Sequence, residues 1–227
     1  MPWLLILAFS AYLLVFRAAA EAWGRRWEKY SKQPASCGLS GEDVARLLLA
    51  AAKVEDIRVV RGRAAESARF EGRGKKILLG PAVYEGRSVA AVALAAQAVV
   101  EALPGLRSNP GGAWRRWVVM FGRGGAGLAV IGMAVLCVFT RLPFRTVIYV
   151  WLGCALVLLL GHGLTLGWEY QVSAEAAKRL RQQGWIRRDE EEAFEEMRKA
   201  VPLRDVLGIG AALRRAFSSL VPMKGWK

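Results

Sequence analysis

Residues 84–102 read YEGRSVAAVALAAQAVVEA, and this stretch predicts the central helix of the region around it. Ser88 belongs to the residue types that cap helix N-termini, and a long apolar run follows it. Pro104-Gly105 then supplies a stop signal. The pattern predicts a helix from Val89 to about Leu103, introduced by a turn that follows Pro81–Tyr84.

The same stretch resembles the active-site helix of the neutral zinc metallopeptidases of bacterial membranes (the YugP type). In that family a similar VYxGRSLAAVAVAAHEVGHA sequence carries a His-Glu-x-x-His motif. Aligned with this chain, the first His falls on Gln97, the Glu on Ala98 and the second His on Glu101. The resemblance covers roughly residues 3 to 200 and implies a small zincin-like domain in a membrane setting.

A second element, EYQVS at Glu169–Ser173, is similar to the family's EFDAS-type element. Its Glu looks like the third zinc ligand of the family and falls on Glu169. Elsewhere the site departs from the pattern: Gln171 replaces the Asp of EFDAS, and Ala68–Gly72 replaces a DHYDP-type segment. The framework is retained and the polar site is lost, which favours loss of catalysis on a preserved scaffold.

The residues at the motif positions argue against zinc chemistry independently of the family. Two His four residues apart on a helix both reach a Zn²⁺ ion at about 2.0–2.1 Å, with the Glu between them as general base. Gln97 and Glu101 keep the spacing without this ligand set, and Ala98 cannot move a proton. We therefore expect no metal, no cofactor and no peptidase activity.

The two carboxylates at Glu101 and Glu169 leave alternatives open. They could hold a hard cation, form an ion pair with Arg69, or face solvent. The only histidine, His162, lies in an apolar run between two glycines. It is either a packing residue or a ligand of a haem- or chlorophyll-type macrocycle.

Three apolar segments in this 227-residue chain are candidate membrane spans: Pro2–Phe16 with Ala18–Ala20 behind it, Gly124–Thr140, and Thr146–Trp168. A signal peptide is the alternative for the first segment, but no basic residues precede its apolar core. The prediction is a membrane α+β protein with three transmembrane helices, a small cytoplasmic helix–sheet–helix domain and C-terminal helices. The expected divisions are an anchor at 2–20, a degenerate zincin-like domain at 21–116, a transmembrane hairpin at 117–168, and cytoplasmic helices with a basic amphipathic tail at 169–227.

Charge predicts the orientation of these segments. Residues 17–116 carry 18 Lys/Arg against 10 Asp/Glu, and residues 169–227 carry 12 against 9. The positive-inside rule therefore places both polar regions in the cytoplasm of a bacterium, on a multi-pass protein of its inner membrane. The scattered arginines favour contact with anionic lipids and argue against nucleic acid as a partner.

Local signals predict the remaining elements. Ser40 and Asp43 form a capping-box pattern that opens a helix with Val44, Leu47, Leu48 and Ala51 on its apolar face. Two β-rich runs, Ile57–Val60 and Lys76–Leu79, predict a sheet of two or three strands. Two helices are expected in the C-terminal region: Glu169–Gln183, which stops at Gly184, and Arg188–Ala200.

The function expected from these observations is that of a catalytically inactive homologue of the zinc metallopeptidases. It would act as an accessory or structural subunit of a membrane protein complex, with other membrane subunits as partners. Two alternatives stay open: a working membrane zinc metallopeptidase with an atypical metal set, and a pseudo-protease adaptor that binds substrate chains in the old cleft.

Overall fold

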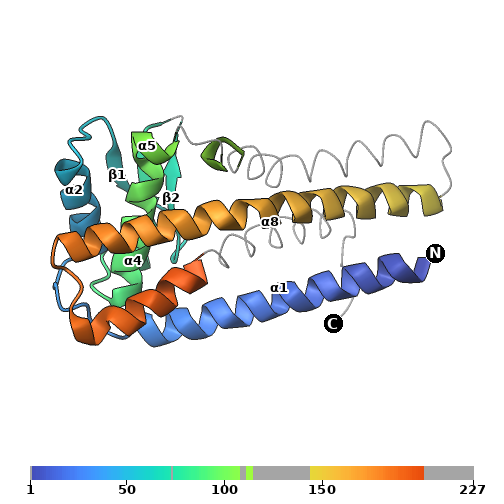
Figure 1. Ribbon diagram of the computed structural model, residues 1–227, viewed down its shortest axis with the longest axis horizontal. Coiled ribbons are helices and arrows are strands. Elements are labelled where there is room, and N and C mark those ends of the chain that lie inside the picture. Colours follow the sequence, from blue (N-terminus) through green and yellow to red (C-terminus); the bar gives the residue numbers. More distant parts are fainter. Residues whose placement is uncertain (1, 73, 108–110, 115–143, 202–227) are drawn as a thin grey trace. The chain divides into compact units, whose positions relative to one another are not determined.

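The structure is a computed structural model that describes residues 2–72, 74–107, 111–114 and 144–201 (Figure 1). Its elements, in chain order, are α1 (Pro2–Ser31), α2 (Gly41–Ala51), β1 (Arg58–Arg61), β2 (Ala68–Glu71), β3 (Lys76–Leu79), α3 (Pro81–Tyr84), α4 (Val89–Ala102), α5 (Pro104–Arg107) and α8 (Phe144–Gln182). A 3₁₀ turn at Arg188–Glu190 leads into a helical segment at 191–201, which we call the covering helix.

The chain divides into two compact units. One contains Glu21–Ala113 and Gly167–Leu203, so it holds the sheet, α2 to α5, the end of α8 and the covering helix. The other includes the first twenty residues and the first part of α8. All residues of the candidate site belong to the unit that contains the sheet.

Helix α4 is the centre of that unit. It contacts α2, α3, α5 and two strands of the sheet (Figure 1). All of its residues except Ala93 are buried, as expected for a helix that is apolar on every side. The Ser88 hydroxyl accepts a hydrogen bond from the Ala91 amide at 3.3 Å, which confirms the predicted cap. Its C-terminal stop is also close to the prediction, although the short α5 follows at Pro104–Arg107.

Helix α2 begins with the predicted capping box. The Ser40 hydroxyl accepts from the Asp43 amide at 3.2 Å, and the Asp43 carboxylate accepts from the Ser40 amide at 3.0 Å. The hydrogen bonds from Ser40 also hold the pKa of Asp43 below its ordinary value. The predicted apolar face was partly wrong, because Leu47 is 46% exposed whereas Leu49 is buried. The packing of α2 on α4 selects a face rotated from the one that periodicity alone indicated.

The sheet has three strands in the order β1-β3-β2, with β1 parallel and β2 antiparallel to β3. The third strand, β2, lies in the Gly- and Arg-rich stretch between the two predicted runs. Ile77 and Leu79 on the central strand are fully buried. Because side chains alternate along a strand, Arg69 lies on the outer side of the sheet and is exposed.

The turn before α4 packs closely against the backbone of α3 and the first turn of α4. A Cβ atom on Gly86 would lie 2.2 Å from the Ala82 carbonyl oxygen and 2.9 Å from the Ala91 side chain. Only glycine fits there, so the GRS turn is a packing requirement of the fold.

Helix α8 runs through Glu169 and ends at Gln182, and Gly184 follows with a φ of 70°. The predicted continuous helix with a stop at Gly184 is therefore confirmed. The helix predicted over Arg188–Ala200 is found as the 3₁₀ turn at Arg188–Glu190 followed by the covering helix.

The mixed α+β class is confirmed by these elements. The first and third apolar runs are helical, in α1 and α8, and Gly124–Thr140 lies outside the described residues. Within the part of the chain that the structure describes, no helix combines the length and apolar character needed to cross a membrane.

Candidate functional site

The motif positions lie on a buried face of α4. Gln97 is 2% exposed, Ala98 1% and Glu101 5%. Glu169, on α8, is 1% exposed. The structure thus brings together two segments that are 72 residues apart: the Gln97 side-chain amide Nε2 donates to the Glu169 carboxylate Oε2 at 3.3 Å.

The surroundings of the two carboxylates differ from the sequence expectations. Both Glu101 and Glu169 are buried, so the alternative that they face solvent was wrong. Among the described residues Arg69 makes no ion pair with either of them, because strand alternation directs it outward. Gln171 is exposed on α8 and does not share the buried side that carries Glu169.

The residues present do not fit a zinc ion. Gln97 offers a neutral amide, and its nitrogen is already directed at Glu169. No group of three or more His, Cys, Asp or Glu side chains suited to a metal occurs within the described part of the chain. Ala98 has no group that accepts a proton at the position of the general base. The Gln97–Glu169 hydrogen bond links α4 to α8 without a metal.

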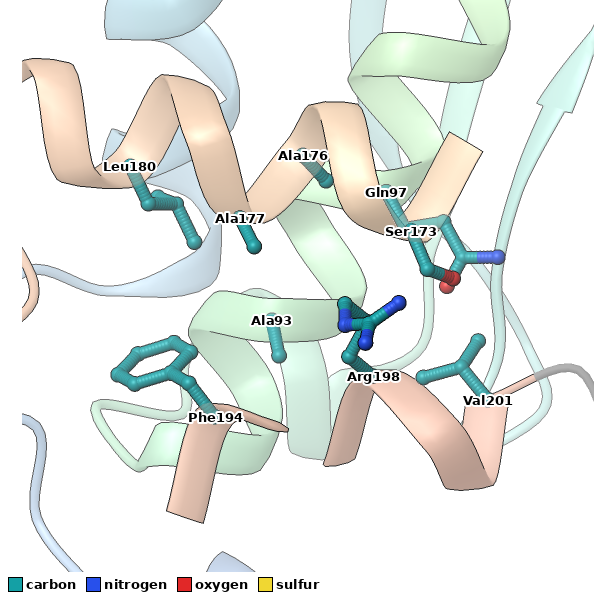
Figure 2. Close-up of a pocket in the computed structure, with 9 residues that line it drawn as sticks. All are labelled: Ala93, Gln97, Ser173, Ala176, Ala177, Leu180, Phe194, Arg198 and Val201. Carbon is teal, nitrogen blue, oxygen red and sulfur yellow. The ribbon is translucent and has the colours of Figure 1, made fainter. Parts of the chain in front are cut away.

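A small pocket lies beside this hydrogen bond, at the junction of three helices (Figure 2). Its volume is about 20 Å³, and it is lined by residues of α4 (Ala93, Gln97), α8 (Ser173, Ala176, Ala177, Leu180) and the covering helix (Phe194, Arg198, Val201). A space of this size admits about one water molecule and no peptide side chain of ordinary size.

The covering helix is attached to the N-terminal part of the same unit by two carboxylates. Glu190, 4% exposed, accepts from the Ser36 amide at 2.6 Å and from the Ser36 hydroxyl. Glu196 accepts from the Tyr30 hydroxyl at 2.6 Å. This hydrogen bond from Tyr30 holds the pKa of Glu196 below its ordinary value, and burial raises the pKa of Tyr30.

Further ion pairs join the covering helix to α8, and one more lies within the covering helix. Arg181 lies 3.0 Å from both Glu191 and Glu195, and Arg198 lies 2.8 Å from Glu195. The sequence analysis missed the buried role of Glu190, which lies within the predicted helix Arg188–Ala200. The partner of Glu190 is Ser36, which is 154 residues away in the sequence, so no local sequence pattern predicts their hydrogen bonds. Ser173 and Arg198 were also missed, because only the fold brings them beside Gln97.

The histidine proposed as a cofactor ligand, His162, lies within α8, and its side chain is outside the part that the structure describes. Its role as a packing residue or macrocycle ligand therefore stays a prediction.

Comparison with known proteins identifies the family of the chain. Residues 4–214 match the family described as "Putative neutral zinc metallopeptidase". The chain is 28% identical over 197 residues to the "Putative membrane protease YugP" of Bacillus subtilis (strain 168). The aligned region covers 86% of this chain and 84% of that protein. No solved structure matches the chain. Because the family match extends over nearly the whole chain, this protein belongs to the neutral zinc metallopeptidase family.

Proposed function

We propose that this protein is a catalytically inactive member of its family that serves as an accessory or structural subunit of a membrane protein complex. One observation carries the proposal. Where the family motif would place a metal ligand, the Gln97 amide donates directly to the Glu169 carboxylate in a buried site. A hydrogen bond of this kind joins α4 to α8 without a metal, so the scaffold has an internal substitute for the ion.

The chemistry of the neighbouring residues supports the same proposal. Hydrolysis by a zincin needs a metal-bound water and a group that removes its proton. The Ala98 methyl group is inert, and Gln97 and Glu101 replace both imidazoles. The working-peptidase alternative would need a metal set that the described residues do not provide.

The membrane setting is part of the proposal. The apolar runs at 2–16, 124–140 and 146–168 and the word "membrane" in the name of the Bacillus subtilis relative support it. We place the polar regions in the bacterial cytoplasm on the inner membrane, with anionic lipids and other membrane subunits as partners. Trp27 on α1 is partly exposed beside Arg25 and Arg26, a composition typical of membrane interfaces, and it stacks at 5.8 Å between ring centroids on Trp23, which is buried.

The substrate-adaptor alternative receives no support from the cleft. The pocket beside Gln97 has a volume of about 20 Å³, and Phe194, Arg198 and Val201 of the covering helix line it. A peptide would have to displace that helix from its bonds to Ser36 and Tyr30.

Metal analysis of the purified full chain tests the inactivity. We expect less than a tenth of an equivalent of zinc and no chelator-sensitive peptide cleavage. The matched positive control is the Gln97→His/Ala98→Glu/Glu101→His variant, which restores the motif on the same helix and should gain zinc. Stoichiometric zinc in the unaltered protein that is lost in Glu169→Ala, with cleavage that a chelator stops, would overturn the proposal.

Photo-crosslinking tests the accessory role. A benzoyl-phenylalanine at Tyr170 replaces an aromatic side chain that is 40% exposed, so it disturbs the fold little. Capture of a few membrane subunits at constant stoichiometry supports the proposal. Capture of many unrelated unfolded chains would favour the adaptor instead.

A further inference from the structure

Two buried oxygen atoms of the pocket have no hydrogen-bond partner among the described residues: the amide Oε1 of Gln97 and the hydroxyl Oγ of Ser173. The residues that carry them are 2% and 4% exposed. A buried polar atom left without a partner destabilises the folded state, so native structures rarely keep two of them in one pocket. Both residues line the same pocket.

The orientation of the Gln97 amide follows from its neighbour. A carboxylate accepts hydrogen bonds, so the side of the amide that faces Glu169 must be the NH₂ group. The carbonyl oxygen is then directed away from Glu169. In Figure 2 this oxygen and the Ser173 hydroxyl oxygen end close to each other, whereas the amide nitrogen points away from them.

The third polar group at the pocket is the guanidinium of Arg198. Its Nε donates to Glu195 at 2.8 Å, and its Nη2 lies 2.8 Å from the same carboxylate. A guanidinium has five N–H donors, so those on Nη1 are left for another acceptor. Arg198 is a lining residue of the pocket, and its guanidinium lies beside the two oxygens in Figure 2.

From these contacts we propose that the pocket binds one ordered water molecule that bridges Gln97 Oε1, Ser173 Oγ and Arg198. Volume decides the size of the ligand: about 20 Å³ exceeds the 10–15 Å³ that one water needs and does not hold two comfortably. Three hydrogen bonds are also the usual number for a buried water.

Charge decides the class of the ligand. An anion would meet the Gln97 carbonyl oxygen, with the Glu169 carboxylate behind its amide. A cation would meet the Arg198 guanidinium and only two oxygen ligands. A neutral molecule that both donates and accepts satisfies all three groups. It donates to Gln97, accepts from Arg198, and does either with the Ser173 hydroxyl.

The water has a structural consequence. It connects α4, α8 and the covering helix through one site, next to the direct Gln97–Glu169 hydrogen bond. The three helices would therefore be joined by polar contacts at the point where the family motif lies. This inference concerns binding alone and does not depend on whether the protein is an inactive subunit.

A structure of the full chain at a resolution that shows ordered water tests the inference directly. We expect one peak within hydrogen-bonding distance of Gln97 Oε1 and Ser173 Oγ. A pocket without density, or a Ser173 hydroxyl bonded directly to Gln97 or to a main-chain carbonyl, would overturn it.

A pair of substitutions supplies a second test in solution. Ala177→Val enlarges a buried pocket residue, whereas Ala174→Val makes the same change at an exposed position one turn away on α8. We expect Ala177→Val to displace the water and to lower Tm by several degrees more than Ala174→Val. In a Gln97→Met/Ser173→Ala background, which removes both oxygens, only the steric cost of the larger side chain remains, so that difference should become clearly smaller. A difference of equal size in both backgrounds would show steric crowding alone and would refute the bridging water.

Discussion

The attachment of the covering helix through Glu190 gives the sharpest prediction, because a neighbouring residue serves as a control. Glu190 is 4% exposed and accepts two hydrogen bonds from Ser36, one from its amide at 2.6 Å and one from its hydroxyl. Glu191, the next residue, is exposed and forms an ion pair with Arg181 at 3.0 Å. Glu190→Ala and Glu191→Ala remove the same side chain from adjacent positions in two different environments.

The magnitude follows from the two bonds. A hydrogen bond to a charged group contributes about 1.5–3 kcal/mol, so the pair contributes about 3–6 kcal/mol if nothing replaces it. Ser36 is exposed, and water will take up part of its bonding when Glu190 is removed. We therefore expect Glu190→Ala to destabilise the unit by about 3 kcal/mol, from the lower end of that range. At 2–4 °C per kcal/mol for a chain of this size, Tm falls by about 6–12 °C.

The control has a much smaller effect. An exposed ion pair contributes about 0–1 kcal/mol, so Glu191→Ala should lower Tm by no more than about 4 °C. Ser36→Ala removes only the hydroxyl and keeps the amide donor, so its effect should lie between the two. In a Ser36→Ala background, Glu190→Ala should cost less than it does alone, because one of the two bonds has already gone.

Thermal unfolding followed by tryptophan fluorescence measures these shifts, and hydrogen exchange locates them. Faster exchange should appear in residues 191–201 of Glu190→Ala and should be absent in Glu191→Ala. The reasoning is refuted if the two variants have the same Tm and the same exchange, since buried and exposed carboxylates would then contribute equally.

Three further predictions concern the same unit. Gly86→Ala should destabilise strongly, because its Cβ would lie 2.2 Å from the Ala82 carbonyl oxygen, whereas Gly105→Ala meets nothing within 4 Å and should be tolerated; expression yield and Tm separate the two. Ser40→Ala should lower the free energy of unfolding by about 1 kcal/mol through loss of the capping box, and a loss in denaturant titration of less than a quarter of that value would contradict it. The hydrogen bond from Tyr30 lowers the pKa of Glu196 from its ordinary value of 4.5, so its contribution is present above pH 4.5 and is lost as the pH falls through the folded value. The Tm difference between Tyr30→Phe and the unaltered protein should therefore shrink below that pH, and a constant difference down to pH 3 would show that Glu196 is not the partner that matters.

Local signals predicted most of the secondary structure correctly. Ser40 and Ser88 cap the helices that follow them, and Gly184 ends α8 as expected, because caps and stops depend on residues within one turn of the helix end. The third strand was harder, since Ala68–Glu71 has no apolar run and is fixed by its antiparallel pairing with β3. The exposure of Leu47 likewise depends on how α2 lies on α4.

For the candidate site, too, some features could be predicted from the sequence and others could not. The sequence by itself determined the family, the loss of both imidazoles and the inert Ala98, because these are matters of residue identity at fixed spacing. Only the tertiary structure decided what replaces the metal chemistry. It placed the Gln97 amide on Glu169, directed Arg69 away from both carboxylates, and brought Ser173 and Arg198 to one pocket. These contacts join segments 72 or more residues apart, and the packing that aligns them leaves no periodic or local trace in the chain.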